Sequence, residues 1–196
     1  SSPIYNVRDS FSIEFWIKLR KSTSTGTILH LPGALSLSVL SGSEINALGA
    51  PSNYSLGIAI GNTCTKTAAN TPYNLTFGTT SGTEKSQSTL NQDHWHHCAI
   101  TYKLETGDLA IYVDGLLNKK ERHEGLTLAT DSGLILGSYF NGSTSDLAKL
   151  TNDKIQGHTD NSQEAEDVAA SNFDCHLNAD IHEIRLWNKV INSKQI

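Results

Sequence analysis

The feature that most constrains this chain is a two-residue alternation of apolar and polar side chains between His94 and Leu117. Such alternation is typical of β-strands that are buried on one face only, as in an antiparallel sheet. Between the two alternating runs, Glu105-Thr106-Gly107-Asp108 has the composition of a tight turn. The sequence therefore predicts a hairpin here. Its core-facing side chains are expected to be Cys98, Ile100, Tyr102 and Leu104 on the first strand, and Leu109, Ile111 and Val113 on the second.

The same alternation is clearest between Phe11 and Leu19, where every second residue is large and apolar. Trp16 is the exception, because it is a large apolar residue on the polar face. It either packs under a covering loop or forms an exposed ligand platform. With about nine or ten short strands and almost no helix, the chain is expected to be an all-β, antiparallel two-sheet sandwich with long polar loops. The other expected strands are 28–31, 35–39, 56–60, 74–80, 126–129, 133–139 and 181–187.

Length and charge narrow the class of protein. The 196 residues fit one domain, 1–196, and the formal net charge is −5 with no run of Lys or Arg. Duplex nucleic acid and anionic membrane surfaces are therefore not expected partners, and no apolar run is long enough for membrane insertion. Since the chain contains no methionine and no signal peptide, we expect it to be a piece excised from a larger protein.

One region lacks any strand pattern. Residues 141–178 are long and polar, and loops of this length are uncommon in compact domains unless they are functional, disordered or inserted. We expect this polar insertion to contain one short helix, Ser162–Ala170, in which Ser162 is the N-cap.

The cysteines and histidines leave alternatives open. Cys98 lies at a core-facing position and is either a buried thiol or half of a disulfide with Cys64 or Cys175. His94 and His96 share a strand face, which could begin a zinc site, but zinc needs three or four ligands. A surface position is the simpler expectation for His182.

Three phrases, in this order, carry a family resemblance: Phe-Ser-Ile-Glu-Phe-Trp-Ile-Lys (11–18), Trp-His-His-Cys-Ala-Ile-Thr-Tyr with Leu-Ala-Ile-Tyr-Val-Asp-Gly (95–102 and 109–115), and Ala-Asp-Ile-His-Glu-Ile-Arg-Leu-Trp-Asn-Lys (179–189). Together they resemble the laminin-G-like and pentraxin-like jelly rolls of the concanavalin A-like lectin/glucanase superfamily. The resemblance implies a non-catalytic module that binds glycans or protein ligands, often through a calcium site at one rim. The resemblance favours an extracellular or cell-surface localisation, with an intracellular localisation as the alternative.

The resemblance also suggests where calcium would bind. In the pentraxin-like members, calcium ligands follow a Leu-Gly at the end of a strand, and here Leu136-Gly137 is followed by Asn141. Calcium takes six to eight oxygen ligands. Asp146 and Asp174, later in the insertion, are the carboxylates expected to join Asn141 as metal ligands.

Aromatic and amide residues of the loops are the expected ligand-binding set. The rings of Tyr54, Tyr139 and Phe140 are predicted to stack on a sugar, and Asn53 and Asn141 to hydrogen-bond its hydroxyls, with ordinary loop packing as the alternative reading.

Catalysis is not expected, because a glycoside hydrolase needs two carboxylates on one face. Glu14 is alone on its strand, and Asp180 and Glu183 fall on opposite faces of a regular strand. A scaffolding domain of a large multidomain protein is the alternative function, and a glycoside hydrolase is the third.

Overall fold

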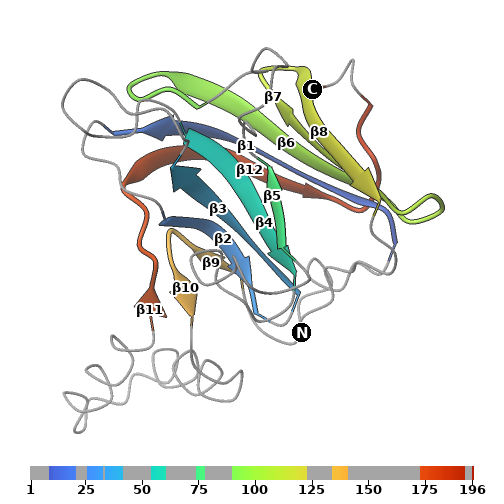
Figure 1. The fold of residues 1–196 in the computed structure, drawn as a ribbon, viewed down its shortest axis with the longest axis horizontal. Helices are drawn as coiled ribbons and strands as arrows, with labels where there is room; N and C mark the ends of the chain where they lie inside the picture. The colour runs from blue at the N-terminus through green and yellow to red at the C-terminus, as the bar shows by residue number, and fades with distance from the viewer. Residues whose placement is uncertain are drawn as a thin grey trace, which may run out of the picture.

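The computed structural model of the protein describes residues 9–20, 26–32, 34–41, 54–60, 74–77, 90–122, 134–140, 173–192 and 196. The regular elements in these ranges are all β-strands. They form two five-stranded antiparallel sheets and a separate two-stranded one (Figure 1). The prediction of an all-β, two-sheet jelly-roll sandwich is confirmed. Within the described ranges, the chain has no helix that is long and apolar enough to cross a membrane.

The first sheet contains the strands with the strongest alternation. Its order is β12-β1-β6-β7-β8. The predicted hairpin is present as β6 and β7, with Cys98 opposite Val113 and Ile100 opposite Ile111. The strands are β1 (Phe11–Leu19), β6 (Trp95–Lys103), β7 (Asp108–Val113), β8 (Leu116–Arg122) and β12 (Ala179–Trp187).

The second sheet has the order β5-β4-β3-β2-β9. Strand β2 lies inside it, between β3 and β9, and is buried along its whole length. The strands are β2 (Gly26–Leu31), β3 (Leu35–Ser41), β4 (Tyr54–Ile60), β5 (Asn74–Phe77) and β9 (Ile135–Leu136).

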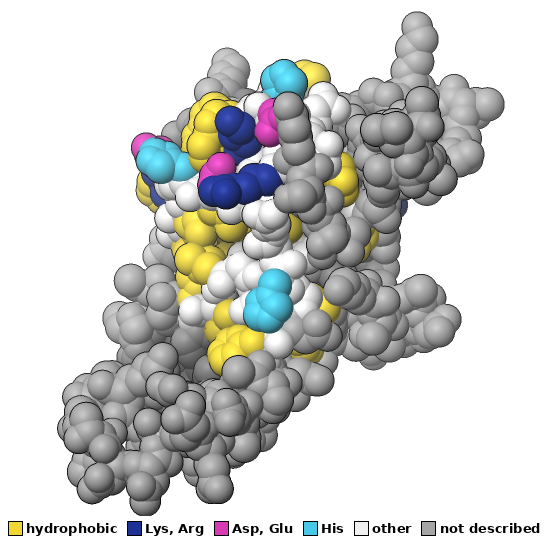
Figure 2. Space-filling model, turned by 90° about the vertical axis from the view of Figure 1, so that its left-hand side faces the viewer, with side chains coloured by type: hydrophobic (Ala, Val, Ile, Leu, Met, Phe, Trp, Pro, Cys, Tyr) yellow, Lys and Arg dark blue, Asp and Glu magenta, His cyan; other side chains and the backbone are white. Residues whose placement is uncertain are grey.

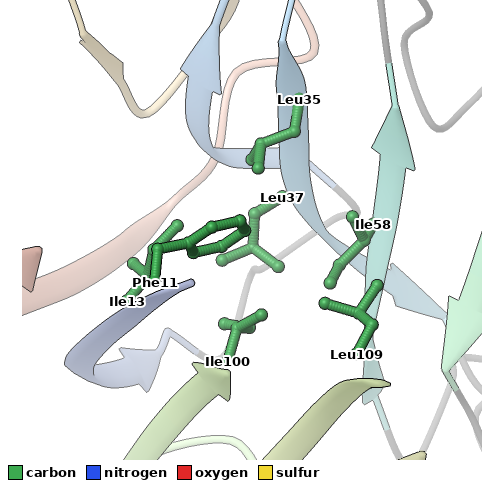
Figure 3. A pocket seen from close by; sticks show the side chains of 7 residues that line it. All are labelled: Phe11, Ile13, Leu35, Leu37, Ile58, Ile100 and Leu109. Carbon is green, nitrogen blue, oxygen red and sulfur yellow. The ribbon is translucent and has the colours of Figure 1, made fainter. Parts of the chain in front are cut away.

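The core lies between the inner faces of the two sheets. All five predicted apolar residues of β1 are buried, at no more than 1% exposure. Burying one such side chain stabilises the fold by about 1.5–3 kcal/mol. A cavity of about 10 Å³ remains between the sheets (Figure 3). It has the size of one water molecule at most and a wholly apolar lining, so it is a packing defect and not a ligand site. Its lining residues are Phe11, Ile13, Leu35, Leu37, Ile58, Ile100 and Leu109.

The free thiol of Cys98 is part of this core. It is fully buried and forms no disulfide, as the simpler of the two predictions stated. Burial, together with the charge of Asp114, raises the pKa of the thiol, which keeps it in the unreactive protonated form.

A short pair of strands, here called the stem, brackets residues 141–172, so the polar insertion expected over 141–178 contains one strand near its end. The stem consists of β10 (Tyr139–Phe140) and β11 (Phe173–Asp174), whose residues pair as Tyr139 with Asp174 and Phe140 with Phe173. The single strand expected over 133–139 is instead divided into β9 and β10, because Gly137 takes a left-handed conformation with φ of 76°. Residues 141–172, with the helix predicted over 162–170, lie outside the described residues, as does the strand expected over 126–129.

Candidate functional site

The outer face of the first sheet carries the most distinctive group of side chains. Because the odd-numbered residues of β1 face the core, its even-numbered residues point outward. Trp16 is paired with His97 of β6 on one side and with His182 of β12 on the other. Two residues further along β1, Lys18 is paired with Trp95. Three neighbouring strands thus bring aromatic and charged side chains to one surface.

We call Trp16, Trp95, His97 and His182 the aromatic platform. Trp16 is 39% exposed and Trp95 is 47% exposed, so both indoles reach solvent. The ring of Trp16 packs at a tilt on His97, with centroids 5.1 Å apart. The ring of Trp95 meets the edge of His182 at 6.5 Å. Of the two readings of Trp16, the exposed platform therefore fits its position better than a side chain covered by a loop.

A buried carboxylate supports the platform. Glu14 is only 6% exposed, and its Oε1 accepts hydrogen bonds from the indole nitrogen of Trp187 at 3.0 Å and from Nη1 of Arg185 at 3.4 Å. Its other oxygen lies 3.5 Å from Nε2 of His97. A buried charge is stable only when it is paired and hydrogen-bonded in this way. Glu14 therefore links the platform, through His97, to strand β12.

A β-bulge in β12 adds a second carboxylate to the same face. Between Glu14 and Trp16 the pairing partners shift from Arg185 to His182, so β12 contains an extra residue there. Glu183 takes a left-handed backbone conformation at this point, with φ of 52°. Its Oε2 lies 2.7 Å from Nη2 of Arg185. The expectation of a regular strand, with Glu183 directed away from the face of Asp180, is therefore wrong.

The bulge bears on catalysis, because it brings Glu14 and Glu183 to the same side of the sheet. The guanidinium of Arg185 lies between them and contacts both carboxylates. A glycoside hydrolase keeps the space between its two acids for the scissile bond and a water or sugar carbon. Here that space holds an arginine.

The platform is open at one end and covered at the other. Beyond Glu14, the hydroxyl of Ser12 donates to the carbonyl of Lys189 at 2.8 Å and accepts from the amide of Ile191 at 3.0 Å. The segment after β12 therefore folds over Ser12, which is fully buried.

Figure 2 shows basic, acidic and histidine side chains gathered beside hydrophobic ones in the upper half of the molecule, where Figure 1 draws the first sheet.

The predicted rim residues occupy different positions from those expected. Tyr54, Tyr139 and Phe140 are 2%, 5% and 3% exposed. These rings pack inside the protein and present no face on which a sugar could stack. Their positions fit the alternative reading of ordinary packing better than the predicted contact with a sugar. Asn53 and Asn141 lie outside the described residues, and their hydrogen bonds to a ligand stay a prediction.

Tyr139 and Phe140 instead enclose a buried histidine. The ring of Tyr139 stacks on His30 of β2 at 4.1 Å, and the amide of Phe140 donates to Nδ1 of His30 at 3.1 Å. With Nδ1 accepting, the ring proton is on Nε2, which is buried and has no hydrogen-bond partner among the described residues. Burial lowers the pKa of His30 to about 4, so the imidazole is neutral at physiological pH.

The candidate metal ligands are only partly described. Asp174 belongs to β11 through its backbone, whereas Asn141 and Asp146 lie outside the described residues. The calcium site therefore stays a prediction. For zinc, both ring nitrogens of His96 are already used: Nδ1 bonds Asp114 at 2.7 Å, and Nε2 accepts from the amide of Asn91 at 3.0 Å. The described ranges bring no three potential metal-binding side chains together.

Sequence reasoning singled out Trp16 but missed its partners. Trp95 could have been predicted, because it is two residues from His97 and alternation places both side chains on the outward face of the same strand. The roles of Glu183, Arg185 and Trp187 depend on the β-bulge in β12, which the sequence pattern of this strand does not predict.

Comparison with known proteins agrees with this architecture. Residues 2–150 match the family model described as the concanavalin A-like lectin/glucanases superfamily. No curated protein matches the sequence.

Several solved structures share the fold. A heptameric SAP-like pentraxin from Limulus polyphemus superposes with a TM-score of 0.59 at 12% identity, over 96% of this chain and 68% of the pentraxin. A candidate carbohydrate-binding protein from Bacteroides ovatus gives 0.56 at 19% identity, over 100% of this chain but only 42% of that protein. The CBM40 domain of a Ruminococcus gnavus IT-sialidase, bound to α2,3-sialyllactose, gives 0.55 at 11% identity, over 96% and 81% of the two chains. With the family model covering most of its length, this chain belongs to the concanavalin A-like lectin/glucanase superfamily.

Proposed function

We propose that this chain is a non-catalytic glycan-binding module and that the aromatic platform is its binding surface. The observation that carries the proposal is the exposure of two indoles, Trp16 and Trp95, on the rigid strands β1 and β6. Indole rings combine a large apolar face with a polar N–H, which suits the C–H-rich face of a sugar. Beside them, Glu183 and Arg185 offer hydrogen-bond acceptors and donors to hydroxyl groups.

The structural relatives support the same class of ligand. The Ruminococcus gnavus CBM40 structure contains α2,3-sialyllactose. Domain 4 of an arabinanase from Geobacillus stearothermophilus, which superposes with a TM-score of 0.51 at 12% identity, contains arabinotriose. A non-catalytic role is favoured by Arg185, which lies between Glu14 and Glu183 where a hydrolase would hold its substrate.

A glycan array probed with the wild-type chain and with the W16A/W95A double variant tests the proposal. We expect the double variant to lose at least about tenfold in affinity, which corresponds to about 1.4 kcal/mol. The matched control is Leu136→Ala, which removes a half-exposed apolar side chain from β9 of the second sheet. It should bind as the wild type does.

Repeating the array with calcium and with a chelator separates the platform from the predicted rim site. Binding that needs calcium and survives in the W16A/W95A variant would place the ligand at the rim, with Asn141, Asp146 and Asp174, and would contradict the platform. If the folded wild-type chain bound no glycan at all, the scaffolding alternative would replace this proposal.

A further inference from the structure

The spacing of the two indoles bears on the size of the ligand. Trp16 and Trp95 are diagonal neighbours, since Trp16 pairs with His97 and Trp95 is two residues from His97 on the same strand. Diagonal pairs in an antiparallel sheet lie about 7–8 Å apart, and somewhat less between their Cβ atoms. Each indole packs on a different histidine, Trp16 on His97 and Trp95 on His182. They are therefore two separate stacking positions and not one stacked pair.

The charges around the platform bear on the chemistry of the ligand. Nη1 of Arg185 bonds Glu14 and Nη2 bonds Glu183, so its two terminal nitrogens both have carboxylate partners. Arg20 bonds Asp180 at 2.6 Å. Lys18 lies across the strand from this same Asp180, and Nζ of Lys189 lies 5.4 Å from the ring centroid of Trp187. The guanidinium groups of Arg185 and Arg20 are therefore both paired with carboxylates of this surface.

An acidic sugar would compete with the carboxylates for these guanidinium groups. To reach Arg185 its carboxylate would have to displace Glu183 and leave that carboxylate without its partner, and like charges brought together oppose binding. Hydroxyl groups have no such conflict, because a paired acid and arginine accept and donate hydrogen bonds side by side. Glu183 is held at the bulge next to His182, so it stays at the edge of the platform.

From these observations we infer that the platform takes an uncharged oligosaccharide of at least two sugars, which lies across β1 and β6 with one ring on Trp16 and another on Trp95. This inference rests on the proposed function, but it can fail while that function stands. Glu183 acts in it as a specificity-determining residue that rejects acidic sugars from Arg185.

Isothermal titration of the whole chain with two ladders of neutral probes tests the length requirement. The ladders are glucose to cellotetraose and arabinose to arabinotetraose. In the ladder that binds, we expect affinity to rise at least about tenfold from one sugar to two or three and then to level off. Trp16→Ala and Trp95→Ala should each remove this step, while Leu136→Ala should keep it. Equal affinity for one sugar and for the longer probes overturns the inference but leaves glycan binding in place.

Matched acidic probes test the charge requirement. Lactose is compared with 3′-sialyllactose, and cellobiose is compared with cellobiouronic acid, the same disaccharide with one glucose replaced by glucuronic acid. We expect the neutral member of the pair that binds to be favoured by about tenfold or more, and Glu183→Gln to narrow that ratio by freeing Arg185. A preference for the acidic member in the wild type contradicts the inference. A folded wild-type chain that binds none of these neutral or acidic probes contradicts both the inference and the proposed function.

Discussion

Strands β1 and β2 both lie in the interior of a sheet, but their outer faces are covered to different extents. On β2, the outward Thr27 and His30 are polar but almost completely buried. On β1, the outward Trp16 is apolar but reaches solvent. Alternation therefore identifies which side of a strand faces the core, but it does not reveal whether the other side is covered. That depends on what the rest of the chain places over it.

The largest expected effect comes from the covered strand. A Cβ at Gly26 would lie 2.5 Å from the carbonyl oxygen of His176 and 2.7 Å from Cα of Leu177, so the backbone that crosses β2 leaves no room for it. We expect Gly26→Ala to lower the free energy of unfolding by about 3 kcal/mol in urea denaturation. Gly115→Ala is the control, because its Cβ would meet nothing within 4 Å and only its left-handed φ is strained, at about 1–2 kcal/mol. Equal losses would mean that the crossing segment moves aside.

His30 should make the stability of the protein depend on pH. Its folded-state pKa of about 4 lies below the unfolded value near 6.5, so the unfolded chain binds the proton more readily between these values. Stability should be unaffected above pH 6.5 and should fall as the pH drops from 6.5 to 4. The full loss of about 3 kcal/mol is reached only below pH 4.

Denaturation curves at several pH values measure this effect. His30→Gln, which cannot titrate but can still accept from the amide of Phe140, should flatten the profile over this range. His94→Gln, at an exposed histidine, should leave the profile as it is. A wild-type profile unchanged by His30→Gln would assign the pH dependence to other groups.

A smaller loss of stability is expected when the carboxylates at the outer face of the first sheet are neutralised. Glu14→Gln removes a buried charge that bonds Trp187 and Arg185, and we expect a loss of about 1–2 kcal/mol with a shift in tryptophan fluorescence. Glu183→Gln alters an exposed ion pair with the same arginine and should cost less than about 1 kcal/mol. If both variants lost the same stability, Glu14 would not be the support of the platform.

The sequence predicted the scaffold well because its signals are local. The alternation in Phe11–Leu19 and in the β6–β7 hairpin identified the core-facing residues that are now found buried. The exception is Leu104, which follows the end of β6 and is 41% exposed. Strand ends are set by the turn, and alternation alone does not mark them.

The site was less predictable because it depends on tertiary contacts. Tyr139 and Phe140 were expected to present their rings to a sugar, but the pairing of β10 with β11 and the stack on His30 bury them. The register shift that brings Glu183 beside Arg185 comes from one extra residue in β12, and a shift of one residue reverses which face a side chain takes.

The stem formed by β10 and β11 has a consequence for how this domain can change. Tyr139 and Asp174 are paired, so the segment between them begins and ends at adjacent points. Doubling the length of a flexible loop with fixed ends costs only about 0.6 kcal/mol. The stem therefore holds the two ends of residues 141–172 next to each other, whatever the length of the segment between them. We therefore expect changes in the length or sequence of residues 141–172 to leave the pairing of β10 with β11 and the two large sheets in place.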